Sequence, residues 1–237
     1  MRICLWEKRK VRLTAAALVA ILILCIAASV MWLTAAADNP VVAPVYQAPA
    51  GKNLVALMIN VDWGEEILPA MLEALAKEKI KATFFISGRF AERQAEMVRT
   101  IAAAGHEIAN HGYSHPHVDR LSINENQNEI IKTSEALKAA GVTESPYFAT
   151  PYGEKKEHVI QAAEALNYKV IFWTLDTVDW KEPSVDTILQ RIVPKAADGA
   201  LILAHPKACT VDAIPGLAAG IREKGLEFAS LSDILAE

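Results

Sequence analysis

The chain has 237 residues and a net charge of −4. After residue 37 it carries 19 Lys and Arg against 27 Asp and Glu, which gives this part a net charge of −8. Because so acidic a segment offers no basic stripe, we exclude nucleic acid as a partner.

Residues 13–37 predict a membrane anchor. The stretch has no charged residue and is rich in Leu, Ile, Ala and Val. A helix of this length, rising about 1.5 Å per residue, crosses a hydrocarbon core of about 30 Å. Residues 1–12 before it are strongly basic, with Glu7 as the single acid. The positive-inside rule therefore predicts a cytoplasmic tail, a single-pass signal-anchor in the cell membrane and an exported remainder.

A cleaved signal peptide is the alternative, because Ala35–Ala37 suits a cleavage site and cleavage would give a secreted protein. The apolar run is longer than a usual signal core, which favours the anchor. Residues 38–53 contain three prolines and no apolar period, typical of an extended linker. Residues 54–237 remain, enough for one domain with a full core. Cys209 is the single cysteine there, so this domain has no internal disulfide.

From Leu54 onward, short apolar strands alternate with amphipathic helical stretches. The predicted strands cover 54–62, 82–87, 106–111, 147–151, 169–177, 200–205 and 227–232. The predicted helices cover 66–79, 92–105, 123–141, 156–168, 185–197 and 211–225. Repeated strand-helix-strand units imply parallel strands, and hence an α/β fold with either a doubly wound sheet or a barrel.

Polar residues of this domain gather at the carboxyl ends of the predicted strands. They are Asp62, His111, Pro151 with Tyr152, Asp176 with Asp179, and His205. In a βα barrel that end is where active sites are assembled from the loops of different strands. Five strands thus direct acids and imidazoles to one rim, which favours an enzyme.

The histidines suggest metal chemistry at this rim. His111 and His115 are four residues apart, and together with a carboxylate two imidazoles can hold one divalent ion. A second carboxylate would then take a proton from water, and His205 would protonate the leaving group. The alternative for His205 is a satisfied core residue at a strand end. His106 and His117 are interpreted as bystanders.

These residues resemble the polysaccharide deacetylases with a NodB-like domain, carbohydrate esterase family four, and are most similar to the subgroup of spore-forming bacteria. The resemblance covers essentially all of residues 54–237. Its motifs are NVDWG at 60–64, KATFF at 81–85, GHEIANHGYSHPH at 105–117, TPYG at 150–153, FWTLDTVDW at 172–180 and GALILAHP at 199–206. The resemblance implies an irregular (β/α)7 barrel that removes N-acetyl groups from peptidoglycan or chitin-like N-acetylglucosamine polymers.

The family's motifs assign roles to individual residues. His111 and His115 match the metal-binding histidines, and His205 matches the general acid. Asp179, followed by Trp180, matches the acidic motif that orients this acid, with Asp176 as the second choice. The remaining match is Tyr152, which follows Pro151. In the family, the backbone N–H of this tyrosine helps to bind the oxyanion. The implied cofactor is a divalent metal, zinc first, with cobalt or another transition metal as alternatives.

The first departure from the family lies in the first motif, where two adjacent aspartates normally precede a glycine as base and metal ligand. With Gly64 in register, Asp62 is the base and Trp63 takes the ligand's position, which an indole cannot fill. A shifted register puts Asn60 at the base position and makes Asp62 the metal ligand. Both registers remain open.

The second departure is Ala149, which stands where the third motif begins with an arginine that pairs with the base. Arg89 and Arg93 are candidates to replace it, and the alternative for both is a solvated helix start. These departures lower the expected activity.

The leading hypothesis is a monomeric, membrane-anchored, metal-dependent N-deacetylase of a cell-envelope glycan. The alternatives are a catalytically impaired, glycan-binding member of the same fold and a metal-binding envelope protein without sugar chemistry.

Overall fold

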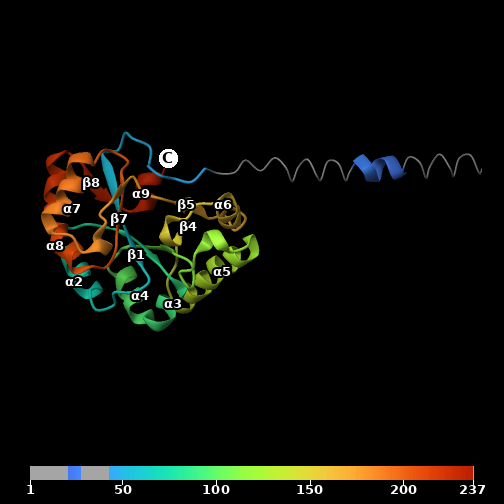
Figure 1. Cartoon of the computed structure of the whole chain (residues 1–237), viewed down its shortest axis with the longest axis horizontal. Helices are drawn as coiled ribbons and strands as arrows, with labels where there is room; N and C mark the ends of the chain where they lie inside the picture. The colour runs from blue at the N-terminus through green and yellow to red at the C-terminus, as the bar shows by residue number, and fades with distance from the viewer. Residues whose placement is uncertain (1–20, 28–42, 237) are drawn as a thin grey trace, which may run out of the picture. The chain divides into compact units, whose positions relative to one another are not determined.

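The computed structural model describes residues 21–27 and 43–236 (Figure 1). They belong to two separate units, Met1–Val41 and Val42–Glu237. Residues 21–27 of the first unit form a helix with exposed side chains. The rest of the predicted anchor and the predicted cytoplasmic tail lie outside the described residues. Within the described part of the chain, no helix has the length and apolar character needed to cross a membrane.

The second unit is built on one parallel sheet, which confirms the predicted α/β class. The strand order is β5-β4-β3-β2-β1-β7-β6, and β8 pairs with β1. The strands are β1 Leu54–Val61, β2 Thr83–Ile86, β3 Glu107–Asn110, β4 Tyr147–Ala149, β5 Lys169–Ile171, β6 Leu175–Asp176, β7 Leu201–Ala204 and β8 Glu227–Ala229. The central strand β1 is an apolar run buried along nearly its whole length, as expected for a strand covered on both faces.

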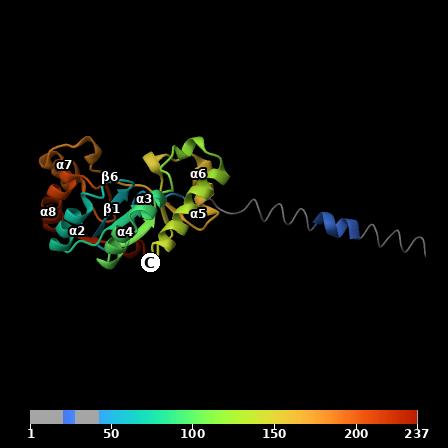
Figure 2. The ribbon, with the colours of Figure 1, turned by 90° about the horizontal axis from the view of Figure 1, so that it is seen from below.

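Helices surround the curled sheet in both views of the ribbon (Figures 1 and 2). They are α2 Leu68–Lys77, α3 Gly88–Arg93, α4 Ala95–Ala103, α5 Ile123–Ala139, α6 Glu157–Glu164, α7 Val185–Ile192, α8 Ala208–Glu223 and α9 Leu231–Leu235. Each predicted helix has a counterpart, although the stretch 92–105 spans the break between α3 and α4. The longest, α5, begins with a capping box of Ser122 and Glu125. Helix α9 was not predicted.

The predicted strand 169–177 is wrong as a single element. Its first part, β5, pairs with β4, and its second part, β6, pairs with β7, so the two lie at opposite edges of the sheet. Among the described residues no ladder joins these two edges. The fold is therefore a curled parallel sheet, consistent with the expected irregular (β/α)7 barrel but open between β5 and β6.

Residues 43–50, which we call the strap, lie against β5 and against Gly199, just before β7. Val45 donates its N–H to the carbonyl of Val170 (2.9 Å) and accepts from the N–H of Phe172 (2.8 Å). Ala48 donates to the carbonyl of Gly199 beside β7 (2.9 Å). The C-terminal part of the predicted linker is thus packed on the domain.

Candidate active site

The site lies where neighbouring parallel strands end. Asp62 follows β1, Ser87 follows β2, His111 follows β3 and His205 follows β7. These four strands are adjacent in the order β3-β2-β1-β7, so their carboxyl ends share one edge. The topology therefore brings the predicted acids and imidazoles to one rim.

Asp62 is a buried carboxylate that forms an ion pair with the partly exposed Arg89. Its side chain is 7% exposed, and Oδ1 accepts hydrogen bonds from Ser87 Oγ and from Arg89 Nε, both at 2.7 Å. A second guanidinium nitrogen, Nη2 of Arg89, contacts Oδ2, which makes the pairing bidentate. Burial raises the pKa of Asp62, but the hydrogen bonds from Arg89 and Ser87 outweigh it, so the pKa lies below its usual value. Asp62 is therefore a fixed carboxylate at neutral pH.

The arginine that pairs with this carboxylate does not come from the position at which the family motif has one. Ala149 is buried in β4, and its carbonyl accepts a hydrogen bond from Nδ1 of His111 at 2.8 Å. Arg89 takes over the pairing from the first turn of α3, where Ser87 is the N-cap. Arg93, the other candidate, is exposed at the end of the same helix.

His111 and His115 face one another. Their ring centroids are 4.9 Å apart, in an edge-to-face arrangement. Because the carbonyl of Ala149 only accepts, Nδ1 of His111 carries the proton and Nε2 keeps its lone pair. Burial, together with the neighbouring His115, lowers the pKa of His111 to about 3. His111 is thus a neutral imidazole with one nitrogen available as an acceptor or ligand.

These residues do not complete the metal site that the family implies. A catalytic zinc ion usually has three protein ligands and one open position. Asp62 is engaged by Arg89 through both carboxylate oxygens, and the next residue is Trp63. In the described part of the chain, no group of three or more His, Cys, Asp or Glu side chains is placed to share an ion. Two imidazoles without a third ligand do not fit a catalytic metal.

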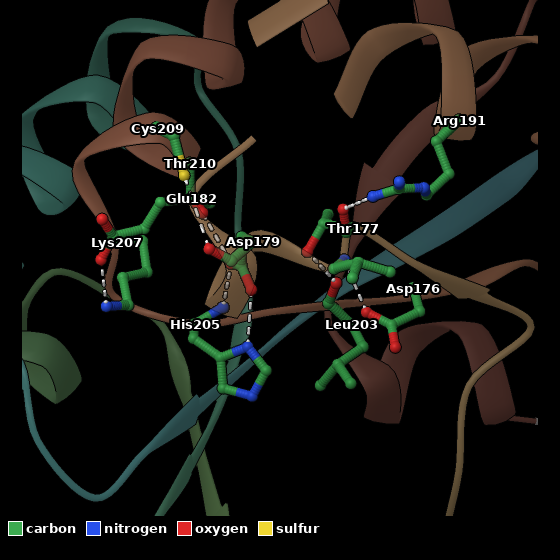
Figure 3. A network of polar contacts seen from close by, with 11 residues as sticks. Asp176, Thr177, Asp179, Glu182, Arg191, Leu203, His205, Lys207, Cys209 and Thr210 are labelled. Atoms are coloured by element: carbon green, nitrogen blue, oxygen red, sulfur yellow. Dashed lines mark hydrogen bonds and ion pairs between the residues drawn. The ribbon is translucent and has the colours of Figure 1, made fainter. Parts of the chain in front are cut away.

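The His205 side chain is paired with a fully buried carboxylate (Figure 3). Oδ1 of Asp179 contacts Nδ1 of His205 at 2.7 Å, and Oδ2 accepts from the backbone N–H of His205 and from Thr210 Oγ1, both at 2.6 Å. Burial raises the pKa of Asp179, but the hydrogen bond from His205 and the other contacts outweigh it, so the pKa lies below its usual value. The anionic Asp179 fixes the ring and leaves Nε2 of His205 directed away from the pair.

Trp63 lies beside this pair. Its indole is nearly parallel to the ring of His205, with centroids 6.2 Å apart and an interplanar angle of 12°. The Nζ atom of Lys207 lies 4.7 Å from the centroid of the same indole. With Gly64 in register, the residue at the family's ligand position therefore forms an aromatic surface next to the predicted general acid.

Tyr152 lies on the other side of the histidines. It adopts a left-handed backbone conformation with φ of 58°, and its ring is 4.7 Å from His115 and 4.3 Å from His117. The stacking partner His117 is held by Glu154 (2.7 Å). Pro151, which precedes the tyrosine, is buried. The structure thus joins Tyr152 to the histidine loop and also places His117 against the tyrosine.

Three further residues that the sequence analysis considered lie outside this group of rim side chains. Asp176 accepts the N–H of Val178 at 2.7 Å, so its carboxylate serves a local turn, and Asp179 is the one beside His205. Trp180 is 53% exposed. His106 lies at the opposite end of β3 from His111, where Nδ1 accepts the N–H of Ala82. His106 is therefore a structural histidine, as the sequence indicated.

Sequence reasoning missed Ser87 and Thr210, and named Arg89 as one of two options. Ser87 follows an apolar strand in the same way as Asp62 does, so its position carried a usable signal. Thr210 lies inside α8, and its bond to Asp179 depends on packing that no local pattern reveals.

The fold and the rim are those expected of a domain of the NodB type, and the comparisons agree. The family model described as polysaccharide deacetylase matches residues 47–171. The chain is 35% identical to the peptidoglycan-N-acetylglucosamine deacetylase of Bacillus cereus over 191 residues, which is 78% of this chain and 70% of that protein. The chain belongs to the polysaccharide deacetylase family.

Two further similar proteins are also from Bacillus, in line with the resemblance to the subgroup of spore-forming bacteria. The uncharacterized protein YlxY of Bacillus subtilis is 34% identical over 82% of this chain, which spans only 61% of YlxY. The crystal structure of a CE4 family pseudoenzyme from Bacillus anthracis matches with a TM-score of 0.79 and 36% identity, covering 82% of this chain and 69% of that one. A mutant of that pseudoenzyme with restored enzymatic activity matches equally well, with a TM-score of 0.79 and 35% identity.

Proposed function

We propose that this chain is a glycan-binding member of the polysaccharide deacetylase family in which N-deacetylation is impaired. The observation that carries the proposal is Trp63, an indole at the position of a metal-ligating carboxylate, beside an Asp62 already neutralised by Arg89. Without a third ligand the two histidines hold a divalent ion weakly. The glycan is a cell-envelope polymer of N-acetylglucosamine, peptidoglycan or chitin-like.

Two relatives support both parts of this proposal. The Bacillus cereus relative is named a peptidoglycan-N-acetylglucosamine deacetylase, which points to the glycan. The Bacillus anthracis structure is described as a pseudoenzyme, and a mutant of it as having restored activity, so in that protein the loss of chemistry is reversible by mutation. The same situation here would follow from one missing ligand in an otherwise complete rim.

The test is acetate release by the full-length chain in detergent, with zinc or cobalt, from N-acetylglucosamine oligomers and from peptidoglycan. We expect background release from the wild type and a gain in the W63D variant, because an aspartate at position 63 supplies the missing carboxylate. The gain should disappear in the double variant W63D/H205A. Binding of the oligomers by the wild type should survive chelation. Wild-type acetate release that depends on His205 would contradict the proposal.

The second candidate is slow N-deacetylation by the wild-type chain. Two observations favour it, namely the Asp62–Arg89 pair and the Asp179–His205 pair, which hold a base and an acid ready at the rim. The same assay separates the two candidates, because slow turnover would be lost in H205A without any change at Trp63.

The proposed location of the protein in the cell is inferred from the sequence. The proposed arrangement is a single-pass anchor at residues 13–37, a cytoplasmic N-terminus and a monomeric domain exported to meet the envelope glycan. Support for it comes from the uncharged apolar run and the basic residues before it.

A further inference from the structure

A pocket opens beside Trp63, on the side of the rim formed by the loop after β7. Its volume is about 400 Å³, roomy enough for one sugar ring. Its lining combines an exposed indole with charged groups, and consists of Trp63, Glu66, Ile67, Glu182, Pro206, Lys207, Ala208 and Cys209. An aromatic face next to polar groups is the usual composition of a site for a small polar ligand.

An ammonium group already lies in this pocket. Nζ of Lys207 is 4.7 Å from the centroid of Trp63 and 2.8 Å from Oε1 of Glu182 (Figure 3). Cations are attracted to the face of an indole, and a neighbouring carboxylate adds to that attraction. The protein's own lysine therefore shows that the indole and Glu182 form a place where an ammonium group is stabilised.

One carboxylate that lines the pocket, that of Glu66, remains without a cationic partner in the described part of the chain after this pairing. Lys207 is matched by Glu182, whereas Glu66 is exposed and has no cationic partner among the described residues. The charged lining residues thus sum to a negative pocket. This excess suits a ligand that brings a positive charge, and an uncharged acetamide gains nothing from it.

We propose that this pocket binds the free amine of a glucosamine unit, so that the chain recognises glycan that is already N-deacetylated. The inference rests on the proposed glycan-binding function and adds the chemical form of the sugar. The ring of the glucosamine lies against Trp63, and its ammonium pairs with Glu66 beside the position of Lys207. The residue that removes the metal ligand would then supply the binding surface for the product of the family's reaction.

The experiment compares two tetramers that differ only in their acetyl groups, tetra-N-acetylchitotetraose and fully N-deacetylated chitotetraose, by calorimetry with the full-length chain in detergent at low salt. A partly exposed ion pair changes affinity by up to about fivefold. We expect the wild type to bind the amine tetramer about fivefold more tightly, and this preference to shrink as salt is added.

Matched variants assign the preference to the pocket. E66Q should lower the affinity for the amine tetramer severalfold and leave the N-acetyl tetramer unchanged. E65Q, the same charge change at an exposed neighbour outside the pocket lining, should preserve the preference. W63A should weaken the amine tetramer further. Equal affinity for the two tetramers, or equal losses in E65Q and E66Q, would overturn the amine preference alone. Binding of neither tetramer would overturn the proposed function itself.

Discussion

At the scale of single residues, the rim contains two carboxylates, and each is kept ionised by a cationic or proton-donating partner. Asp62 is paired with Arg89, and Asp179 with His205. In both cases burial raises the carboxyl pKa and hydrogen bonds lower it by more, which leaves both pKa values below their usual range. The sequence identified Asp62 from the end of an apolar run, and the resemblance to the family motif selected Asp179 over Asp176. It could not select Arg89 over Arg93, because helix position does not determine where a long side chain points.

The Arg89 pairing predicts a loss of stability in R89A. The variant leaves a 7% exposed carboxylate with Ser87 as its remaining side-chain donor, so we expect the free energy of unfolding at pH 7 to fall by about 1–3 kcal/mol. Asp62 has a folded pKa below its unfolded value. Its contribution is therefore present above the unfolded value of about 3.9 and is lost as pH falls through the folded value. The difference between wild type and R89A, measured by urea unfolding, should shrink at low pH.

R93A provides the matched control for this experiment. Arg93 is exposed on the same helix, so its truncation should change the free energy of unfolding by less than about 0.5 kcal/mol. If R89A and R93A cost the same at pH 7, Arg89 does not hold Asp62.

At the scale of elements, the sequence predicted the strands well where apolar runs are bounded by turn residues, and less well at the open seam. The predicted strand 54–62 and the strand β1 agree to one residue, because an apolar run ending in a carboxylate marks the end of a buried strand. The division of 169–177 into β5 and β6 escaped prediction. Its cause is tertiary, since Thr174 bonds to the backbone of Leu201 and of Tyr46 rather than continuing a ladder. Pairings with residues far away in sequence leave no local pattern.

The packing of the strap predicts that substitution of Gly199 destabilises the domain. Its φ is +82°, and a Cβ there would lie 2.2 Å from the carbonyl oxygen of Ala48 in the strap. G199A should therefore lower the free energy of unfolding by about 2–3 kcal/mol through overpacking and backbone strain. The strap should also become sensitive to limited proteolysis between residues 43 and 50.

The variant G225A separates the effect of overpacking from that of backbone strain. Gly225 has a similar φ of +72° but nothing within 4 Å of an added Cβ. It should thus cost only the left-handed strain, about 1 kcal/mol. Equal costs for G199A and G225A, with no new cleavage in the strap, would mean that the strap is not packed tightly against β7.

At the scale of the whole molecule, the net charge and the proposed anchor both bear on how the domain would meet its glycan. The part after residue 37 has a net charge of −8, which attracts a glycan that carries free amines and repels anionic polymers. An anchor at 13–37 would hold this domain at the membrane surface. The described residues 21–27 are helical and lie within the predicted anchor, and the rest of the anchor lies outside the described residues.

The anchor predicts that the full-length chain, produced in a bacterium, stays in the membrane fraction after alkaline carbonate extraction and is digested by protease added outside the cells. The double variant L22R/I23R should move to the soluble fraction, because each arginine costs about 2.5–3.5 kcal/mol at the centre of a span. The control Q47R/A50R adds the same charges outside the predicted span and should remain membrane-bound. A mature N-terminus near Asp38 would instead establish a cleaved signal peptide, and unchanged extraction of L22R/I23R would contradict the span. Retention together with outside digestion would place the amine-binding pocket where the envelope glycan is.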